Sequence, residues 1–245
     1  MKKIIFERLR IMSLIKIKDE LQQLGNPAQA RVLQRFFKTG KGEYGEGDVF
    51  RGIKIPVLRK LAKKYQDMPW AEVEKLLTSK FHEDRMLALL LLVENYIKAD
   101  DAGEKQIYTM YLRNTRFINN WDLVDVTAHH IVGHYLLDKS REPLYGLARS
   151  EMLWERRIAI IATFHYIRQN KFDDTLKIAG MLINDPHDLM HKAVGWMLRE
   201  VGKRDLQSEE QFLKTHYRQM PRTMLRYAIE RFTEAKRQAY LEGKK

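Results

Sequence analysis

The sequence predicts an all-α protein made of HEAT-like helical-hairpin repeats, which form a curved α-solenoid with a basic concave face. Apolar residues recur at three- and four-residue spacing along most of the chain, and sustained strand alternation is absent. One pattern returns at steps of 32 to 40 residues, the period of helical-hairpin repeats. The net charge of +12 over 245 residues accounts for the expected basic face.

Composition limits the class of protein. The chain contains no cysteine, which excludes a disulfide framework, a thiolate nucleophile and a cysteine-based metal site. Its longest apolar run, Met86 to Val93, is too short to cross a bilayer, and charges interrupt the N-terminal segment where a signal peptide needs apolar residues. We therefore expect a cytoplasmic monomer without a membrane partner. It has one repeat domain over 1–245, with an N-terminal extension over 1–11 and a basic C-terminal tail over 234–245.

The first helices follow from apolar spacing and from proline. Apolar residues at helical spacing predict helices around 21–24, 32–37, 58–65 and 73–77. Because the first turn of a helix tolerates a missing N–H, we interpret each of the six prolines as a helix start. These prolines are Pro27, Pro56, Pro69, Pro143, Pro186 and Pro221.

A glycine-rich stretch separates two of these helices. Five of the 13 glycines fall between Gly40 and Gly52, which predicts one long loop. The glycines lack the spacing of a Walker loop, so the stretch is not interpreted as a nucleotide site. We expect the loop to cross a helix layer or to contact a ligand through its backbone.

Five later segments align as repeats, each with a charged residue before an apolar run rich in small residues. They begin at His82, Asn120, Leu153, Asp188 and Arg222. The shared charged position is occupied by Arg85, Asp125, Arg157, Lys192 and Arg226. Because the second helix of each hairpin lines the concave face, these side chains are expected to form a ladder of four basic residues and one acidic residue.

Asp125 is the acidic exception in this ladder. A carboxylate there opposes the binding of DNA phosphate, so it costs affinity unless it has another role. Trp121 precedes it by four residues, which places an indole and a carboxylate on one helical face. Asp125 either takes part in chemistry or pairs with Arg157 of the next repeat. Trp154 and Trp196, in the two following repeats, belong either to the core or to a ligand surface.

Several segments resemble those of a known family. FINNWDLVD, LWERRIAI and HKAVGWMLREVGK resemble signature stretches of the AlkD-type DNA alkylation repair glycosylases, a HEAT-like repeat family that acts on alkylated purines. The stretch FFKTGKGEYGEGDVFRGIKIPVLRKLAKKY is similar to the N-terminal part of many members. The resemblance covers roughly residues 14 to 233, with its motifs in order and at the family's spacing.

The resemblance implies a DNA glycosylase of base excision repair. Its reaction is hydrolysis of the N-glycosidic bond of cationic purines such as 3-methyladenine and 7-methylguanine in double-stranded DNA, without metal or cofactor. The family's catalytic aspartate matches Asp125, its two active-site tryptophans match Trp121 and Trp196, and its arginine matches Arg157. The lesion is then reached from the sugar-phosphate side, without extrusion of the nucleotide into a deep pocket.

These residue types suit the implied chemistry. Positive charge develops on the sugar during glycoside hydrolysis, and Asp125 has the sign to stabilise that charge and to hold the attacking water. The indole faces favour a nearby cation. Arg157 is expected to grip a flanking phosphate and to keep Asp125 ionised. Further contacts to the DNA backbone are expected from Arg156, Lys192 and Arg199.

Two other functions are alternatives to the glycosylase. The pairs His130/His134 and His187/His191 have the i, i+4 spacing of metal ligands, but neither has the glutamate of H-E-x-x-H, so we expect no metal site. A non-catalytic HEAT-like module that binds nucleic acid or protein is the main alternative to the enzyme. The lone carboxylate of Asp125 favours the enzyme, because a module that only binds DNA has no use for it.

Overall fold

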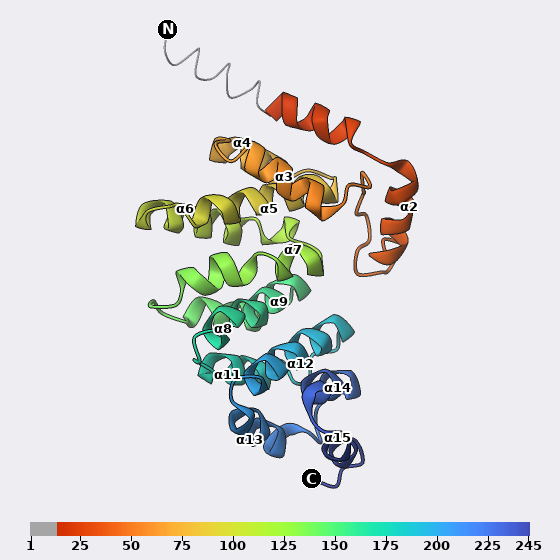
Figure 1. The fold of residues 1–245 in the computed structure, drawn as a ribbon, viewed down its shortest axis with the longest axis vertical. Helices are drawn as coiled ribbons and strands as arrows, with labels where there is room; N and C mark the ends of the chain where they lie inside the picture. The colour runs from red at the N-terminus through yellow and green to blue at the C-terminus, as the bar shows by residue number, and fades with distance from the viewer. Residues whose placement is uncertain (1–13) are drawn as a thin grey trace. The chain divides into compact units, whose positions relative to one another are not determined.

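The computed structural model describes residues 14–245, and every regular element in this part of the chain is helical (Figure 1). An isolated bridge between Val49 and Phe81 is the only β pairing among these residues. The described chain divides into two compact units, one ending at Leu123 and the other running from Val124 to Lys245. The predicted all-α class is confirmed, whereas the predicted extension over 1–11 lies outside the described residues.

The first unit is built around one buried helix, α5. Its elements are helical residues 14–23, α2 (Pro27–Phe36), α3 (Ile55–Lys64), α4 (Trp70–Leu77), α5 (His82–Tyr96), α6 (Asp101–Arg113), η1 (Thr115–Phe117) and the first residues of α7 (Trp121–Asp125). The α5 side chains from Met86 to Leu92 are all buried, which is typical of a core helix that is apolar on every face. The hairpin helices α3 and α4 both pack against α5.

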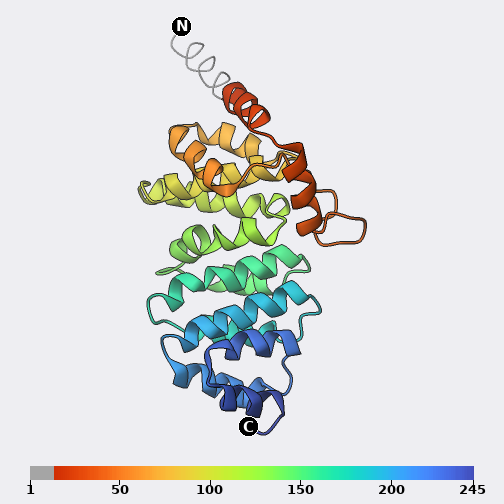
Figure 2. The same ribbon diagram turned by 45° about the vertical axis from the view of Figure 1, so that its right-hand side comes forward.

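The second unit consists of successive helical pairs. Its elements are η2 (His129–Gly133), α8 (Glu142–Ala148), α9 (Leu153–Ala162), α10 (Phe164–Ile167), α11 (Asp173–Met181), α12 (Asp188–Gly202), α13 (Leu206–His216), α14 (Arg222–Ala228), η3 (Ile229–Arg231) and α15 (Glu234–Leu241). Helix α12 packs between α9 and α14, while α8 pairs with α9 and α11 with α12 (Figure 2). This order confirms the predicted HEAT-like helical hairpins.

Prolines mark the helix starts as predicted. Pro27 begins α2, and Pro56 and Pro143 lie in the first turns of α3 and α8. Pro69 and Pro221 precede α4 and α14 as their N-cap residues. Pro186 lies two residues before Asp188, the first residue of α12. In every case the missing N–H falls where a helix has no backbone acceptor for it.

The repeat helix expected from Asn120 is interrupted after Asp125. A turn follows, in which the N–H of Thr127 donates to the carbonyl of Val124 at 3.1 Å, and the chain then enters the π-helical segment η2. Within η2, Gly133 packs so closely on α9 that a Cβ there would lie 2.2 Å from the carbonyl oxygen of Ala162. Such π-helical turns are frequent near functional sites.

The segment expected as a basic tail forms a packed helix. Residues Glu234–Leu241 make up α15, and Tyr240 is only 3% exposed. Its ring meets that of Tyr217 edge-on, with the centroids 5.4 Å apart. None of the helices in residues 14–245 combines the length and apolar character that crossing a lipid bilayer requires.

The loop over 37–54 crosses from α2 back to the start of α5. Its backbone N–H groups at Arg51, Gly52 and Ile53 donate to the Glu83 carboxylate, at distances of 2.7 to 3.1 Å. Gly52 has a φ of +84°, and a Cβ at this position would lie 2.1 Å from the carbonyl oxygen of Asn26. The predicted layer-crossing role of the loop therefore depends on a glycine at this close approach.

Gly52→Ala is expected to lower the free energy of unfolding by about 2 kcal/mol, because a side chain is strained at positive φ and also collides with the α2 N-terminus. Urea unfolding measures the change. Gly42→Ala is the matched control, since Gly42 has a φ of +81° but open space around its Cβ position. Equal losses of stability in the two variants would contradict the close approach at Gly52.

Candidate functional site

Asp125 and Arg157 form a two-pronged ion pair in the second unit. Asp125 is the last residue of α7, and Arg157 lies on α9. Nε of Arg157 donates to Oδ1 of Asp125 at 2.9 Å, and Nη2 donates to Oδ2 at 2.8 Å. The two side chains are 5% and 16% exposed, so the carboxylate is fixed in orientation yet keeps some access to solvent. Such paired charge-assisted bonds are among the strongest in proteins.

The third bond of Arg157 reaches a further helix. Its Nη1 donates to the carbonyl oxygen of Leu189 on α12, at 2.6 Å. Within the second unit the guanidinium therefore joins Asp125, α9 and α12. The interpretation of Asp125 as an ion-pair partner of Arg157 is confirmed by this geometry. The side chain expected to grip a phosphate is instead turned towards Asp125 and Leu189.

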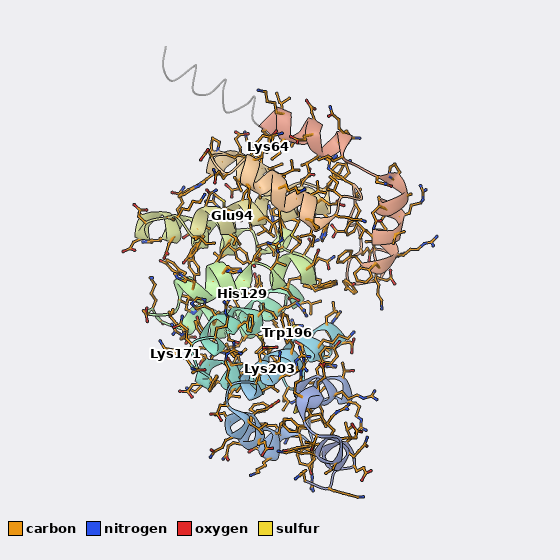
Figure 3. All side chains as sticks on the ribbon, in the orientation of Figure 1. Lys64, Glu94, His129, Lys171, Trp196 and Lys203 are labelled. Atoms are coloured by element: carbon orange, nitrogen blue, oxygen red, sulfur yellow. The ribbon has the colours of Figure 1, made fainter. Side chains whose placement is uncertain are left out.

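Trp196 occupies α12 with its indole half-buried. The indole Nε1 donates to Oε1 of Glu200 at 3.1 Å, and Lys203 on the same helix binds that oxygen at 2.6 Å. Trp196 and Lys203 are both labelled in Figure 3. Phe164 lies against the indole, with 6.0 Å between the ring centroids. The polar edge of Trp196 is therefore held in place. Trp154, at 8% exposure, belongs to the core.

Trp121 begins α7 and belongs to the first unit. Its indole is half-buried and stacks on Phe37, with the ring planes 28° apart and the centroids at 5.3 Å. Phe36 approaches the indole edge-on at 6.0 Å. The backbone N–H of Trp121 donates to Oδ1 of Asn120 at 2.9 Å. Aromatic packing and the local backbone both fix where the indole lies.

The three residues expected to contact the DNA backbone each face a carboxylate. Nε of Arg156 donates to Asp185 at 2.6 Å, and Lys192 pairs with Asp188 one turn earlier on α12 at 2.7 Å. Arg199 donates to Glu230. The side chains of Arg156 and Arg199 are 15% and 18% exposed, against 40% for Lys192. Lys192 is therefore the most accessible of the three.

His187 and His191 bind protein groups, whereas the rings of His130 and His134 lie against those of His129 and His165, with centroids 3.9 Å and 5.0 Å apart. Nδ1 of His187 accepts the backbone N–H of Leu189 at 3.1 Å, and Nε2 of His191 lies 2.6 Å from the carbonyl oxygen of Asp185. Burial, together with the neighbouring His130, lowers the pKa of His129 to about 3. Within residues 14–245 no group of three or more histidine, aspartate or glutamate side chains has an arrangement that could hold a metal ion.

Sequence reasoning missed a buried polar network in the first unit. His82 lies between two carboxylates, with its Nδ1 3.0 Å from Asp48 and its Nε2 2.9 Å from Asp122. Arg85, expected on the basic ladder, is 3% exposed and donates to Asp48. The sequence feature that could have indicated this network is the charge-rich helix start HEDR. Burial of these charged groups costs free energy unless they are paired.

Comparisons with known proteins agree with this architecture. A family model described as DNA alkylation repair enzyme matches residues 17–232. Among solved structures, a predicted DNA alkylation repair enzyme from Enterococcus faecalis is similar in fold, with a TM-score of 0.67 and 18% identity. The similarity covers 86% of this chain and 97% of that chain. No match was found among curated proteins. Because the family model spans most of its length, the chain belongs to the family of DNA alkylation repair enzymes.

Proposed function

We propose that this protein is a monofunctional DNA glycosylase that hydrolyses the N-glycosidic bond of cationic alkylated purines in duplex DNA. Family membership supports a role in the repair of alkylated DNA. The observation that carries the proposal is the carboxylate of Asp125, which Arg157 fixes with two hydrogen bonds while 16% of its side chain stays exposed. A carboxylate held in this way is preorganised to stabilise a developing positive charge.

Hydrolysis of the N-glycosidic bond of these lesions needs little from the protein beyond the negative charge of Asp125. In 3-methyladenine and 7-methylguanine the base is already cationic, so the C1′–N bond breaks with its electron pair returning to the base and neutralising it. Positive charge then develops on the deoxyribose, where Asp125 stabilises it. Water attacks C1′ and loses a proton to the carboxylate or to solvent. The products are a free base and an abasic site.

The two tryptophans are proposed to contact the sugar that carries this charge. Trp121 lies four residues before Asp125 in α7, and Trp196 lies on α12, the helix that also supplies the Leu189 carbonyl to Arg157. Both indoles are half-buried, so each has an exposed portion. The negative face of an indole attracts a cation, with about 1 to 2 kcal/mol at a partly desolvated site.

DNA binding is expected to depend steeply on salt. Each phosphate neutralised by a basic side chain contributes about −0.9 to the slope of log affinity against log salt concentration. We propose that Lys192, Arg156 and Arg199 make such contacts by exchanging their carboxylate partners for phosphates. Lys192→Gln should therefore make the slope shallower by about one unit. Fluorescence anisotropy on an undamaged duplex measures this, and an affinity that barely changes with salt would contradict a phosphate-based interface.

The test of the activity is single-turnover release of 7-methylguanine from a duplex, with a chelator present. We expect release above the spontaneous rate, with the strand left intact until alkali cleaves the abasic site. A protein that binds duplex DNA but releases no base would contradict the glycosylase. That result would favour a non-catalytic helical-repeat module, in which Asp125 serves only as the structural partner of Arg157.

A further inference from the structure

The network around His82 joins three segments of the first unit. His82 is the first residue of α5, Asp48 belongs to the loop before α3, and Asp122 is the second residue of α7. All three are buried, with His82 only 3% exposed. Arg85, one turn further along α5, donates to the other oxygen of Asp48. A separate ion pair joins the same loop to α5, where Nε of Arg51 donates to Oδ1 of Asp84 at 2.6 Å.

The geometry requires a charged imidazole. Both ring nitrogens of His82 lie within 3.0 Å of carboxylate oxygens, one from Asp48 and one from Asp122. A neutral imidazole has one N–H, so it can donate to one carboxylate only, whereas the imidazolium donates to both. Burial alone would lower the pKa of His82, but the charges and hydrogen bonds of Asp122 and Asp48 raise it to about 9.

This network also fixes the backbone on both sides of Trp121. Asp122, the next residue, is bound by His82, and Asn120, the preceding one, accepts the Trp121 N–H through Oδ1 at 2.9 Å. Nδ2 of the same asparagine donates to Asp48 at 3.4 Å. The start of α7 is thereby anchored to the buried charges at the start of α5.

A stack of rings makes a second connection. The ring of Phe50 stacks on His82 with the centroids 4.5 Å apart, and Phe37 stacks on Phe50 at 5.1 Å. Trp121 in turn stacks on Phe37 at 5.3 Å. A change in the position of the imidazole therefore has both a hydrogen-bonded and a packed route to the indole.

We propose that His82 is a positioning residue for Trp121. The His82 imidazole, held between Asp48 and Asp122, sets the position and tilt of the Trp121 indole, which in turn contacts the sugar. The part concerning the sugar rests on the proposed glycosylase function. The part concerning the indole does not, because every contact in it lies within the first unit.

The experiment observes the indole directly. Protein labelled with 5-fluorotryptophan gives fluorine signals from Trp70, Trp121, Trp154 and Trp196, and Trp121→Phe identifies the one of interest. In the otherwise unchanged protein, the Trp121 signal should shift with a midpoint near pH 9, because loss of the imidazolium proton breaks one of the two carboxylate bonds. A Trp121 signal that stays constant up to pH 10 in folded protein would overturn the proposal.

His82→Gln removes the imidazolium and should abolish that titration while displacing the Trp121 signal at neutral pH. Glu83→Gln is the matched control. Glu83 is buried at 2% exposure beside His82, but its hydrogen bonds go to the backbone of Arg51, Gly52 and Ile53. The Glu83→Gln variant should keep the Trp121 signal at its position and keep its titration, even if the free energy of unfolding falls. Equal displacement of the signal in both variants would reduce His82 to a general structural role.

The rate of base excision tests whether the position of Trp121 affects the proposed glycosylase reaction. With saturating protein, His82→Gln should release 7-methylguanine roughly 10- to 100-fold more slowly while duplex affinity stays within about twofold, because a misplaced contact group costs rate more than binding. Glu83→Gln should keep a near-normal rate. Should the unmodified protein release no base, the proposed function fails, whereas the fluorine titration still decides the positioning role. Normal excision by His82→Gln with a displaced Trp121 signal would reject the link to the sugar.

Discussion

Replacing Asp125 by asparagine is expected to slow the single-turnover release of 7-methylguanine by roughly 10²- to 10³-fold. The substitution keeps the shape of the side chain but removes the negative charge that, in the proposed mechanism, stabilises the sugar cation in the transition state. Affinity for a duplex with an uncleavable lesion analogue should stay the same or rise slightly, because a carboxylate near phosphates repels them. Rate and affinity are measured on the same protein preparation.

Asp174→Asn is the control for loss of an aspartate–arginine pair as such. Asp174 accepts a bond from Arg141 at 3.2 Å, and the two side chains are 22% and 19% exposed, close to the exposure of Asp125. This variant should excise at a near-normal rate. Near-normal excision by Asp125→Asn would reject the mechanism. Equal slowing by both variants would point to a general effect of ion-pair loss.

Much of the helical framework could be predicted because its determinants are local. Apolar spacing fixes which face of a helix is buried, and proline fixes where a helix begins. The pairing of Asp125 with Arg157, 32 residues later, follows from the repeat period, since equivalent positions in successive repeats lie next to each other. The sequence left chemistry and pairing open as alternatives for Asp125, and the pairing is present.

The His82 network could not be predicted, because its partners are distant in sequence and outside the repeat pattern. Asp48 comes from a loop whose glycines and charges are typical of a solvated segment. Asp122 precedes the aligned charged position by three residues. Acidic residues at a helix start usually remain in solvent near the positive end of the helix, yet Glu83 and Asp84 at the start of α5 are 2% and 1% exposed.

The solvent exposure of the basic side chains could not be predicted from the sequence either. The sequence pattern of a basic residue on a helix is the same whether its side chain faces solvent, phosphate or a carboxylate of its own chain. Arg156 and Arg199 pair with nearby carboxylates, whereas Arg226 is exposed. Such pairing between distant residues depends on the rotation of each helix about its axis. Apolar periodicity predicts which face of the helix is buried, but it does not define this rotation more closely.

Arg157→Met is expected to lower the free energy of unfolding by about 3 kcal/mol, because it removes the guanidinium that donates to Asp125 and to the Leu189 carbonyl. This loss lies at the low end for a broken buried pair, since the Asp125 side chain is 16% exposed. Methionine preserves most of the apolar stem, so the loss is assigned to the guanidinium. Excision should also slow strongly, because the carboxylate is no longer held in one orientation.

The double variant Asp125→Asn with Arg157→Met separates the charge from the packing. Removing the carboxylate charge that has lost its guanidinium should restore about 1 kcal/mol relative to Arg157→Met alone, so the two changes are not additive. Urea unfolding of the unmodified protein, the two single variants and the double variant completes this double-mutant cycle. Duplex affinity of folded Arg157→Met should remain close to that of the unmodified protein, because the guanidinium binds Asp125 and Leu189. A large loss of affinity without a loss of stability would instead assign Arg157 to a DNA phosphate, and additive stability effects would show that the pair contributes nothing to the fold.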